Sequence, residues 1–114
     1  MSTRDNVQAV IDGILAGKIM ETFDKYYSDD VVMTENGKDA REGKPACGQY
    51  EQAFVDNVAF HGAQPGLVIV DGDHAAVEWT FDITPKGGSR VTQRQVAVQT
   101  WKDGKIVREE FYHG

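Results

Sequence analysis

Residues 75–113 have the sequence AAVEWTFDITPKGGSRVTQRQVAVQTWKDGKIVREEFYH, and this stretch predicts three long β-strands that fold back on one another. The strands are Ala75–Thr84, Arg90–Lys102 and Lys105–His113. The runs between them, Pro85–Gly88 and Lys102–Gly104, consist largely of turn-forming residues. Because the first half of the chain reads as wholly helical, the order of elements predicts an α+β domain whose helices cover one face of an antiparallel sheet.

The first half contains three predicted helices. The first runs from about Arg4 to Ala16 and ends at Gly17, and the second covers Lys18–Tyr27. The third begins at Gly43-Lys44-Pro45 and ends at Gln64-Pro65-Gly66. Its expected buried face consists of Cys47, Tyr50, Phe54, Asn57, Val58 and His61. Short strands are expected at Val31–Met33 and Leu67–Val70, with a loop at Asn36–Asp39.

The three long strands differ in how clearly they assign an inner face. In the first, Val77, Trp79 and Phe81 alternate with polar residues, so this apolar set should face the helices. In the second strand neither alternating set is purely apolar, which leaves its inner face open. In the third, Val107, Glu109, Phe111 and His113 share one face and Ile106, Arg108, Glu110 and Tyr112 the other. Both placements of Glu109, inside or in solvent, stay open from the pattern alone.

Length, charge and hydrophobicity limit the kinds of protein that this sequence can be. The 114 residues fit a single domain, residues 1–114. A net charge of −6 with scattered Lys and Arg makes nucleic acid an unfavourable partner. No apolar run approaches the roughly 20 residues that cross a bilayer, and the first residues lack a secretory signal pattern. We therefore expect no membrane partner and a cytoplasmic protein.

Candidate metal and nucleophile sites are weak. The three histidines, His61, His74 and His113, lack the paired spacing typical of zinc sites. Asp71–His74 has too few oxygen ligands for a Ca²⁺ loop and predicts a hairpin turn. Cys47 is the single cysteine and predicts a small buried residue on a helix. No metal site is expected.

In element order the chain resembles the NTF2-like superfamily, in its SnoaL-like and ketosteroid-isomerase-like branch. Three stretches carry the resemblance: Ala16–Val31, Glu35–Gly43 and Trp101–Val107. The resemblance implies a cone, in which three helices pack in the concavity of a strongly curved mixed β-sheet, with a pocket at the wide end. It also implies activity without a cofactor and a homodimer.

Position by position, the resemblance puts Glu35 where ketosteroid isomerases keep a general-base carboxylate. The positions of their two oxyanion donors are occupied by Val10 and Ala97, which cannot donate a side-chain hydrogen bond. Losing one such donor typically costs about 10²–10³ in rate. Steroid isomerisation by that mechanism is therefore not expected of this chain.

The resemblance also implies a set of pocket residues. Glu35, Glu109 and His113 are the candidate catalytic residues. The candidate ligand-binding residues are Tyr27, Tyr50, Phe54, Trp79, Phe81, Gln95 and Gln99. For the bulky aromatic residues, the alternative is that they simply fill the core. Carboxylates and an imidazole in an apolar cup suit acid–base chemistry near neutral pH, because burial raises a carboxylic pKa.

Two functions follow from this picture. The first is a cofactor-free isomerase, cyclase or dehydratase acting by acid–base catalysis on a small hydrophobic molecule. The second is a non-catalytic dimeric module that binds a small ligand or another protein. It is favoured by the missing oxyanion donors and by Val96, Val98 and Tyr112, which would form a homodimer contact on the outer sheet face.

Overall fold

The computed structural model describes residues 2–114 and contains three helices and six strands. The helices are α1 (Thr3–Leu15), α2 (Ile19–Tyr26) and α3 (Lys44–Asn57). The strands are β1 (Tyr27–Glu35), β2 (Lys38–Glu42), β3 (Val58–Asp71), β4 (His74–Pro85), β5 (Val91–Lys102) and β6 (Lys105–His113). The predicted α+β class is confirmed.

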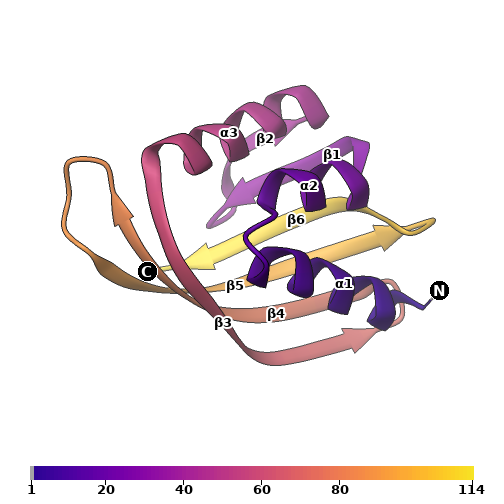
Figure 1. The fold of residues 1–114 in the computed structure, drawn as a ribbon. Coiled ribbons are helices and arrows are strands. Elements are labelled where there is room, and N and C mark those ends of the chain that lie inside the picture. The colour runs from indigo at the N-terminus through magenta and orange to yellow at the C-terminus, as the bar shows by residue number, and fades with distance from the viewer. Residues whose placement is uncertain (1) are drawn as a thin grey trace.

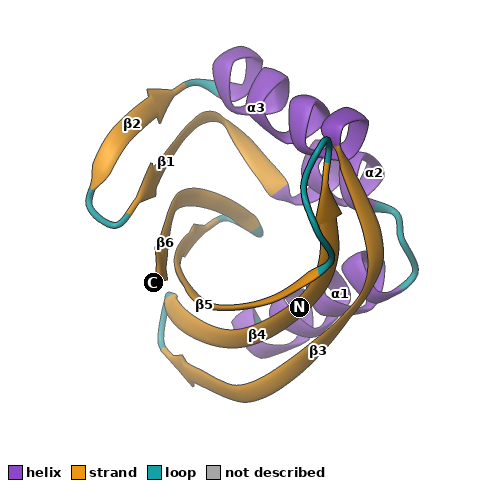
Figure 2. Cartoon of the chain, turned by 90° about the vertical axis from the view of Figure 1, so that its left-hand side faces the viewer, coloured by secondary structure: helices purple, strands orange, loops and turns teal. Residues whose placement is uncertain are grey.

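One mixed sheet contains all the strands, in the order β2-β1-β6-β5-β4-β3. Neighbouring strands are antiparallel except β1 and β6, which are parallel. Figure 1 shows the helices lying over one side of this sheet, and Figure 2 shows the sheet curling strongly around that side. Helix α1 packs on β3 and β4, whereas α2 and α3 pack on β1. The curved sheet and the helices therefore enclose the interior between them.

Helix α1 begins and ends where its sequence predicts. The Ser2 hydroxyl caps it by accepting a hydrogen bond from the Asp5 amide at 3.1 Å. Gly17, with φ of 77°, takes the left-handed conformation that terminates the helix. Val7, Val10 and Ile11 are buried and anchor the helix to the core. At about 25 cal/mol per Å² of apolar surface, each such side chain stabilises the fold by roughly 1.5–3 kcal/mol.

The short strand expected at Val31–Met33 is confirmed as part of β1. The prediction of an otherwise helical first half is wrong, because β1 and β2 form a hairpin between α2 and α3. Asn36 and Gly37 make the turn with φ of 52° and 74°, the double positive φ of a type I′ hairpin. The expected loop at Asn36–Asp39 thus gives way to strand at Lys38. The short strand is hard to recognise because nearly all of it is exposed and polar.

The predicted end of the third helix is also wrong. Helix α3 stops at Asn57, and the chain continues as strand β3 through Pro65. Pairing with β4 along nearly its whole length, from Val58 opposite Pro85 to Asp71 opposite His74, accounts for this. Pro65 is accommodated where the register shifts, a position that tolerates a missing N–H. His61 therefore lies on a strand, with Nε2 2.8 Å from Thr84 Oγ1.

The structure assigns the inner face of β5, which the sequence leaves open. Ala97, Gln99 and Trp101 are buried, whereas Val96 and Val98 are partly exposed on the outer face. In the register, Gln99 lies opposite Glu109 and Gln95 opposite His113. The inward face of β5 therefore carries polar side chains directly beside the inward residues of β6.

Candidate functional site

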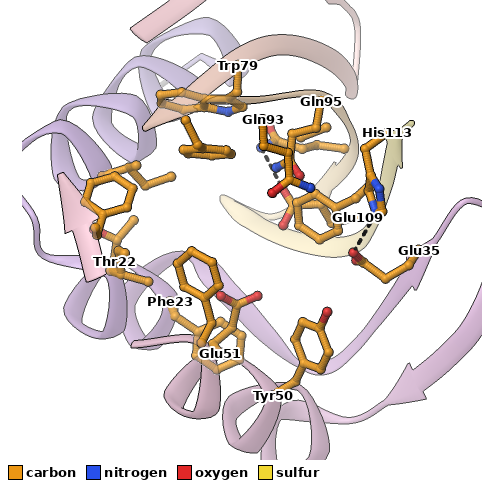
Figure 3. Close-up of a pocket in the computed structure, with 18 of the residues that line it drawn as sticks. Thr22, Phe23, Glu35, Tyr50, Glu51, Trp79, Gln93, Gln95, Glu109 and His113 are labelled. Carbon is orange, nitrogen blue, oxygen red and sulfur yellow. Dashed lines mark hydrogen bonds and ion pairs between the residues drawn. The ribbon is translucent and has the colours of Figure 1, made fainter. Parts of the chain in front are cut away.

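A cavity of about 260 Å³ opens between the helices and the concave face of the sheet. Figure 3 shows polar side chains along one part of its wall and aromatic rings along another. All ten residues proposed from the sequence lie on this wall: Tyr27, Glu35, Tyr50, Phe54, Trp79, Phe81, Gln95, Gln99, Glu109 and His113. Their catalytic and ligand-binding roles stay predictions.

Glu109 is held in a buried hydrogen-bond chain. The carboxylate accepts one bond from the Tyr27 hydroxyl and another, of 2.9 Å, from Gln99 Nε2. The Trp101 indole N–H donates to Gln99 Oε1 at 3.0 Å. Because an indole N–H is only a donor, it orients the Gln99 amide with its NH₂ group toward Glu109. Three side chains thus fix one carboxylate.

Burial sets the acid–base character of the hydrogen-bonded pair Glu109 and Tyr27. It raises the pKa of Glu109 to about 7, although the hydrogen bonds from Tyr27 and Gln99 act in the opposite direction. Burial, followed by the charge of Glu109, also raises the pKa of Tyr27 well above its usual value. Tyr27 therefore remains a donor, while Glu109 can gain or lose a proton near neutral pH.

Glu35 belongs to a separate ionic cluster at the pocket wall. Its Oε1 lies 3.2 Å from His113 Nε2, and its Oε2 lies 3.3 Å from an Arg41 guanidinium nitrogen. The backbone of His113 is held as well, because its N–H donates to Asn36 Oδ1 at 2.8 Å. His113 thus pairs with Glu35 and not with Glu109. The two candidate catalytic residues on β6, Glu109 and His113, therefore belong to different groups of interacting side chains.

Arg41 was missed by the sequence analysis, which placed it just after a loop. It lies on β2, and its guanidinium carbon is 3.6 Å from the centre of the Tyr50 ring, a cation–π arrangement. Among residues 2–114, its buried Nε has no hydrogen-bond partner. Arg41 joins Glu35 to helix α3 at this side of the pocket.

Glu51 was missed as well. It lines the cavity from α3, and its carboxyl group points into the cavity in Figure 3. Burial, and next the charge of Glu109, raise its pKa to about 8, while Arg41 acts in the opposite direction. A signal was present in the sequence, because Glu51 lies four residues after Cys47 and three before Phe54, on one helical stripe.

Aromatic rings form the apolar part of the wall. Trp79 and Phe81 stack, with ring centres 5.4 Å apart and planes 12° apart, and Phe60 lies 6.0 Å from Phe81. Phe23 stacks on Tyr27 at 4.8 Å. These rings line an open cavity, and Trp79, with Phe81 against it, is at the same time part of the hydrophobic core.

The two positions that correspond to oxyanion donors remain apolar in space. Val10 is buried in the core, and Ala97 is buried on the pocket wall. Within residues 2–114, no cluster of three or more His, Cys, Asp or Glu side chains has the arrangement of a metal site. No helix in the described chain is long and apolar enough to span a membrane.

A family model for the SnoaL-like domain matches residues 7–109, nearly the whole chain. The chain belongs to the SnoaL-like domain family. A similar solved structure, of a proposed SnoaL-like polyketide cyclase from Mesorhizobium loti, is 32% identical and has a TM-score of 0.89. That match covers 98% of this chain and 99% of the other. It confirms the resemblance inferred from the order of elements.

More distant structures share the fold of this SnoaL-like domain. An NTF2-like protein from Burkholderia pseudomallei is 17% identical, with a TM-score of 0.86 over 100% of this chain and 92% of that one. An epoxide hydrolase of the LEH-like type from M. tuberculosis is 21% identical, with a TM-score of 0.80 over 98% and 82%. Among curated proteins, none matches the sequence significantly.

Proposed function

We propose that this SnoaL-like protein catalyses proton transfer on a small, largely apolar molecule without a cofactor, as an isomerase, cyclase or dehydratase. The observation that carries the proposal is Glu109, a carboxyl group only 2% exposed, with a pKa raised by burial to about 7. A base with a pKa near the working pH combines a useful ionised fraction with useful proton affinity. Further support for an enzyme comes from similar solved structures, which are described as a proposed polyketide cyclase and an epoxide hydrolase.

In the proposed reaction, Glu109 removes a proton from a carbon next to a carbonyl group. The electron pair of the broken C–H bond moves into a carbon–carbon double bond, and the carbonyl oxygen becomes an enolate. Glu109 then returns the proton to another carbon, or a leaving group departs from the neighbouring carbon. Through their hydrogen bonds, Tyr27 and Gln99 stabilise the ionised carboxylate before it takes the proton and after it has returned it.

Glu35 and His113 have a supporting role in this proposal. Their 3.2 Å contact forms a second proton-holding pair on the same wall, suited to relaying a proton to or from the reacting molecule. Arg41 holds Glu35 from the other side. The aromatic rings of Trp79 and Phe81 supply the apolar surface on which a flat ligand packs.

Hydrogen–deuterium exchange at an enolisable carbon tests this function without the natural substrate. The probe is 2-acetylnaphthalene, whose methyl group exchanges through the enolate, and the readout is deuterium incorporation by mass spectrometry. We expect acceleration by the wild type and its loss in Glu109→Gln. The matched control is Glu110→Gln, the next residue, whose side chain pairs with Arg108 on the outer face. Equal rates in wild type and Glu109→Gln, or no acceleration by either, contradict the proposal.

The second candidate function is a non-catalytic dimeric binding module. The outer sheet face supports it, because Leu67 and Ile69 on β3 and Tyr112 on β6 are 68%, 59% and 43% exposed, and Val98 lies on β5 between these two strands. The same face carries the ion pairs Arg94–Glu78 and Arg108–Glu110. With both signs of charge beside an apolar centre, the face is complementary to a second copy of itself.

A cytoplasmic location is part of the proposal. Its support is Cys47, the single cysteine of the chain, which is free and fully buried.

A further inference from the structure

Glu51 differs from the pocket carboxylates Glu35 and Glu109 in having no hydrogen-bond or ion-pair partner among residues 2–114. Glu35 is paired with Arg41 and His113, and Glu109 is bonded by Tyr27 and Gln99. In the part of the chain that the structure describes, no donor or cation bonds Glu51. Its carboxyl group points from α3 into the open cavity (Figure 3). The group that satisfies it must therefore come from the solvent or from a bound ligand.

The surroundings favour the protonated form of this carboxyl. Glu109 on β6 and Glu35 on β1 face it with like charge, and Arg41 on β2 is the facing cation. Arg41 is already paired with Glu35. The nearby Tyr27 and Cys47, whose own pKa values Glu51 helps to raise, add no positive charge. With its pKa raised by burial to about 8, Glu51 is mainly a neutral acid at pH 7.

A neutral carboxylic acid in an apolar pocket is a hydrogen-bond donor that needs an acceptor. We propose that Glu51 donates a hydrogen bond to the carbonyl oxygen of the ligand, so that the pocket selects uncharged ketones or amides with one or two rings. The proposal rests on the proposed function, in which that oxygen becomes an enolate. The donor would come from α3, in place of the donors that Val10 and Ala97 cannot supply.

Cavity size and charge define the rest of the ligand class. The volume of about 260 Å³ lies just below the ~300–1,000 Å³ typical of sites for drug-sized molecules. A ligand carboxylate or phosphate would face the charge of Glu35 and of the ionised fraction of Glu109, while the Arg41 guanidinium beside Glu35 is already paired. Anionic molecules are therefore excluded by repulsion as well as by desolvation.

Two isosteric probes isolate the proposed hydrogen bond. 2-Acetylnaphthalene carries a carbonyl oxygen, and 2-isopropenylnaphthalene has a CH₂ group in its place. Binding is measured by titration against tryptophan fluorescence, since Trp79 lines the pocket. At pH 7 we expect the ketone to bind the wild type about tenfold more tightly than the hydrocarbon, as one good hydrogen bond allows. 2-Naphthoate, the anionic analogue, should bind more weakly than either.

Variants at position 51 test whether Glu51 causes the tighter binding of the ketone. Glu51→Leu should abolish it without weakening the hydrocarbon, whereas Glu51→Gln keeps a neutral donor and should retain it. In the wild type the ketone preference should fall as the pH rises through about 8, and in Glu51→Gln it should not change. Gln52→Leu, at the exposed neighbouring position, is the control and should behave as wild type.

The outcomes separate this inference from the proposed function. A ketone preference that survives in Glu51→Leu overturns the role of Glu51, even if Glu109-dependent exchange is observed. A preference that depends on Glu51 while the exchange rate is independent of Glu109 supports the binding role and contradicts the catalytic one. If neither neutral probe binds the wild type, the ligand class is wrong.

Discussion

The Tyr27 hydroxyl donates a hydrogen bond to the Glu109 carboxylate across 82 positions of sequence, joining the start of β1 to the middle of β6. Both residues are buried, and both line the cavity. This contact connects the element order of the chain to its chemistry, because it exists only once β1 and β6 have paired in parallel.

Tyr27→Phe should raise the pKa of Glu109 above about 7, because the lost hydrogen bond favours the ionised form. It also leaves a carboxylate oxygen without that donor, which should lower the free energy of unfolding by about 1–3 kcal/mol. Tyr26→Phe, whose ring packs on Trp101, is the control. Carboxyl ¹³C NMR titration measures the pKa, and an unchanged or lowered value would contradict the proposed coupling.

Gln99→Leu should also raise the pKa of Glu109, because Gln99 bonds the carboxylate oxygen that Tyr27 does not. It removes the 2.9 Å hydrogen bond to Glu109, so the pKa of Glu109 rises and the pH profile of exchange moves to higher pH. Gln95→Leu is a matched control on the same face, since Gln95 makes no bond to Glu109 in the described structure. A shift of equal size in both variants would indicate a general change in polarity and not the loss of a specific bond.

Glu35→Gln should leave the fold intact and reduce exchange by about 10²-fold or more, the range expected for a general acid–base group. It removes the charge that pairs with Arg41 and weakens the contact with His113. Asp30→Asn, an exposed change in the same strand, is the control. Full activity in Glu35→Gln would refute the catalytic role of Glu35.

Glu51→Gln should stabilise the protein at pH 8 and not at pH 5. Glu51 has a pKa raised from its usual 4.5 to about 8, so the folded state keeps its proton where the unfolded state has lost it. Stability from this group is therefore present below pH 4.5 and is lost as the pH rises toward 8. A neutral amide avoids the loss, which is about 2–4 kcal/mol at pH 8. Chemical denaturation of the wild type and Glu51→Gln at pH 5 and pH 8 measures the difference in the free energy of unfolding. An equal gain in stability at both pH values would contradict the titration of Glu51 as its cause.

Val98→Arg should convert the proposed dimer to a monomer, because it puts a charge at the centre of the apolar outer face. Thr92→Arg adds the same charge on the same face of β5, at an exposed position away from that centre. Size-exclusion chromatography with light scattering compares the masses. A dimer that persists in Val98→Arg would mean that the interface lies elsewhere.

The strands of the second half were predictable because their local and tertiary requirements agree. In β4, Val77, Trp79 and Phe81 alternate as a half-buried strand must, and Asp103-Gly104 forms the expected turn with φ of 52° and 76°. The residue pattern alone left the inner face of β5 open, because Gln95 and Gln99 look like solvent-facing residues, and it was the family resemblance that placed both in the pocket. They are tolerated inside because Trp101 and Glu109 satisfy Gln99, and because Gln95 faces the cavity.

The errors also have physical causes. The apolar spacing of Cys47, Tyr50 and Phe54 continues by coincidence to His61, so the sequence does not reveal that α3 stops at Asn57. Pairing with β4 then decides the structure of Val58–Asp71. Arg41 was missed because an isolated charged residue beside a turn resembles an ordinary surface residue, and Glu51 was missed although its position on the helical stripe of Cys47 and Phe54 indicated an inward side chain.

Parallel pairing of β1 with β6 has a consequence for biosynthesis. Among the six described strands, the β1–β2 hairpin joins the others only through β6, which is synthesised after them. A nascent chain that lacks Lys105–His113 therefore has two unconnected pieces of sheet and exposed strand edges. Such a chain should depend on chaperones until synthesis reaches His113, because the contacts that complete the fold are among the most distant in sequence.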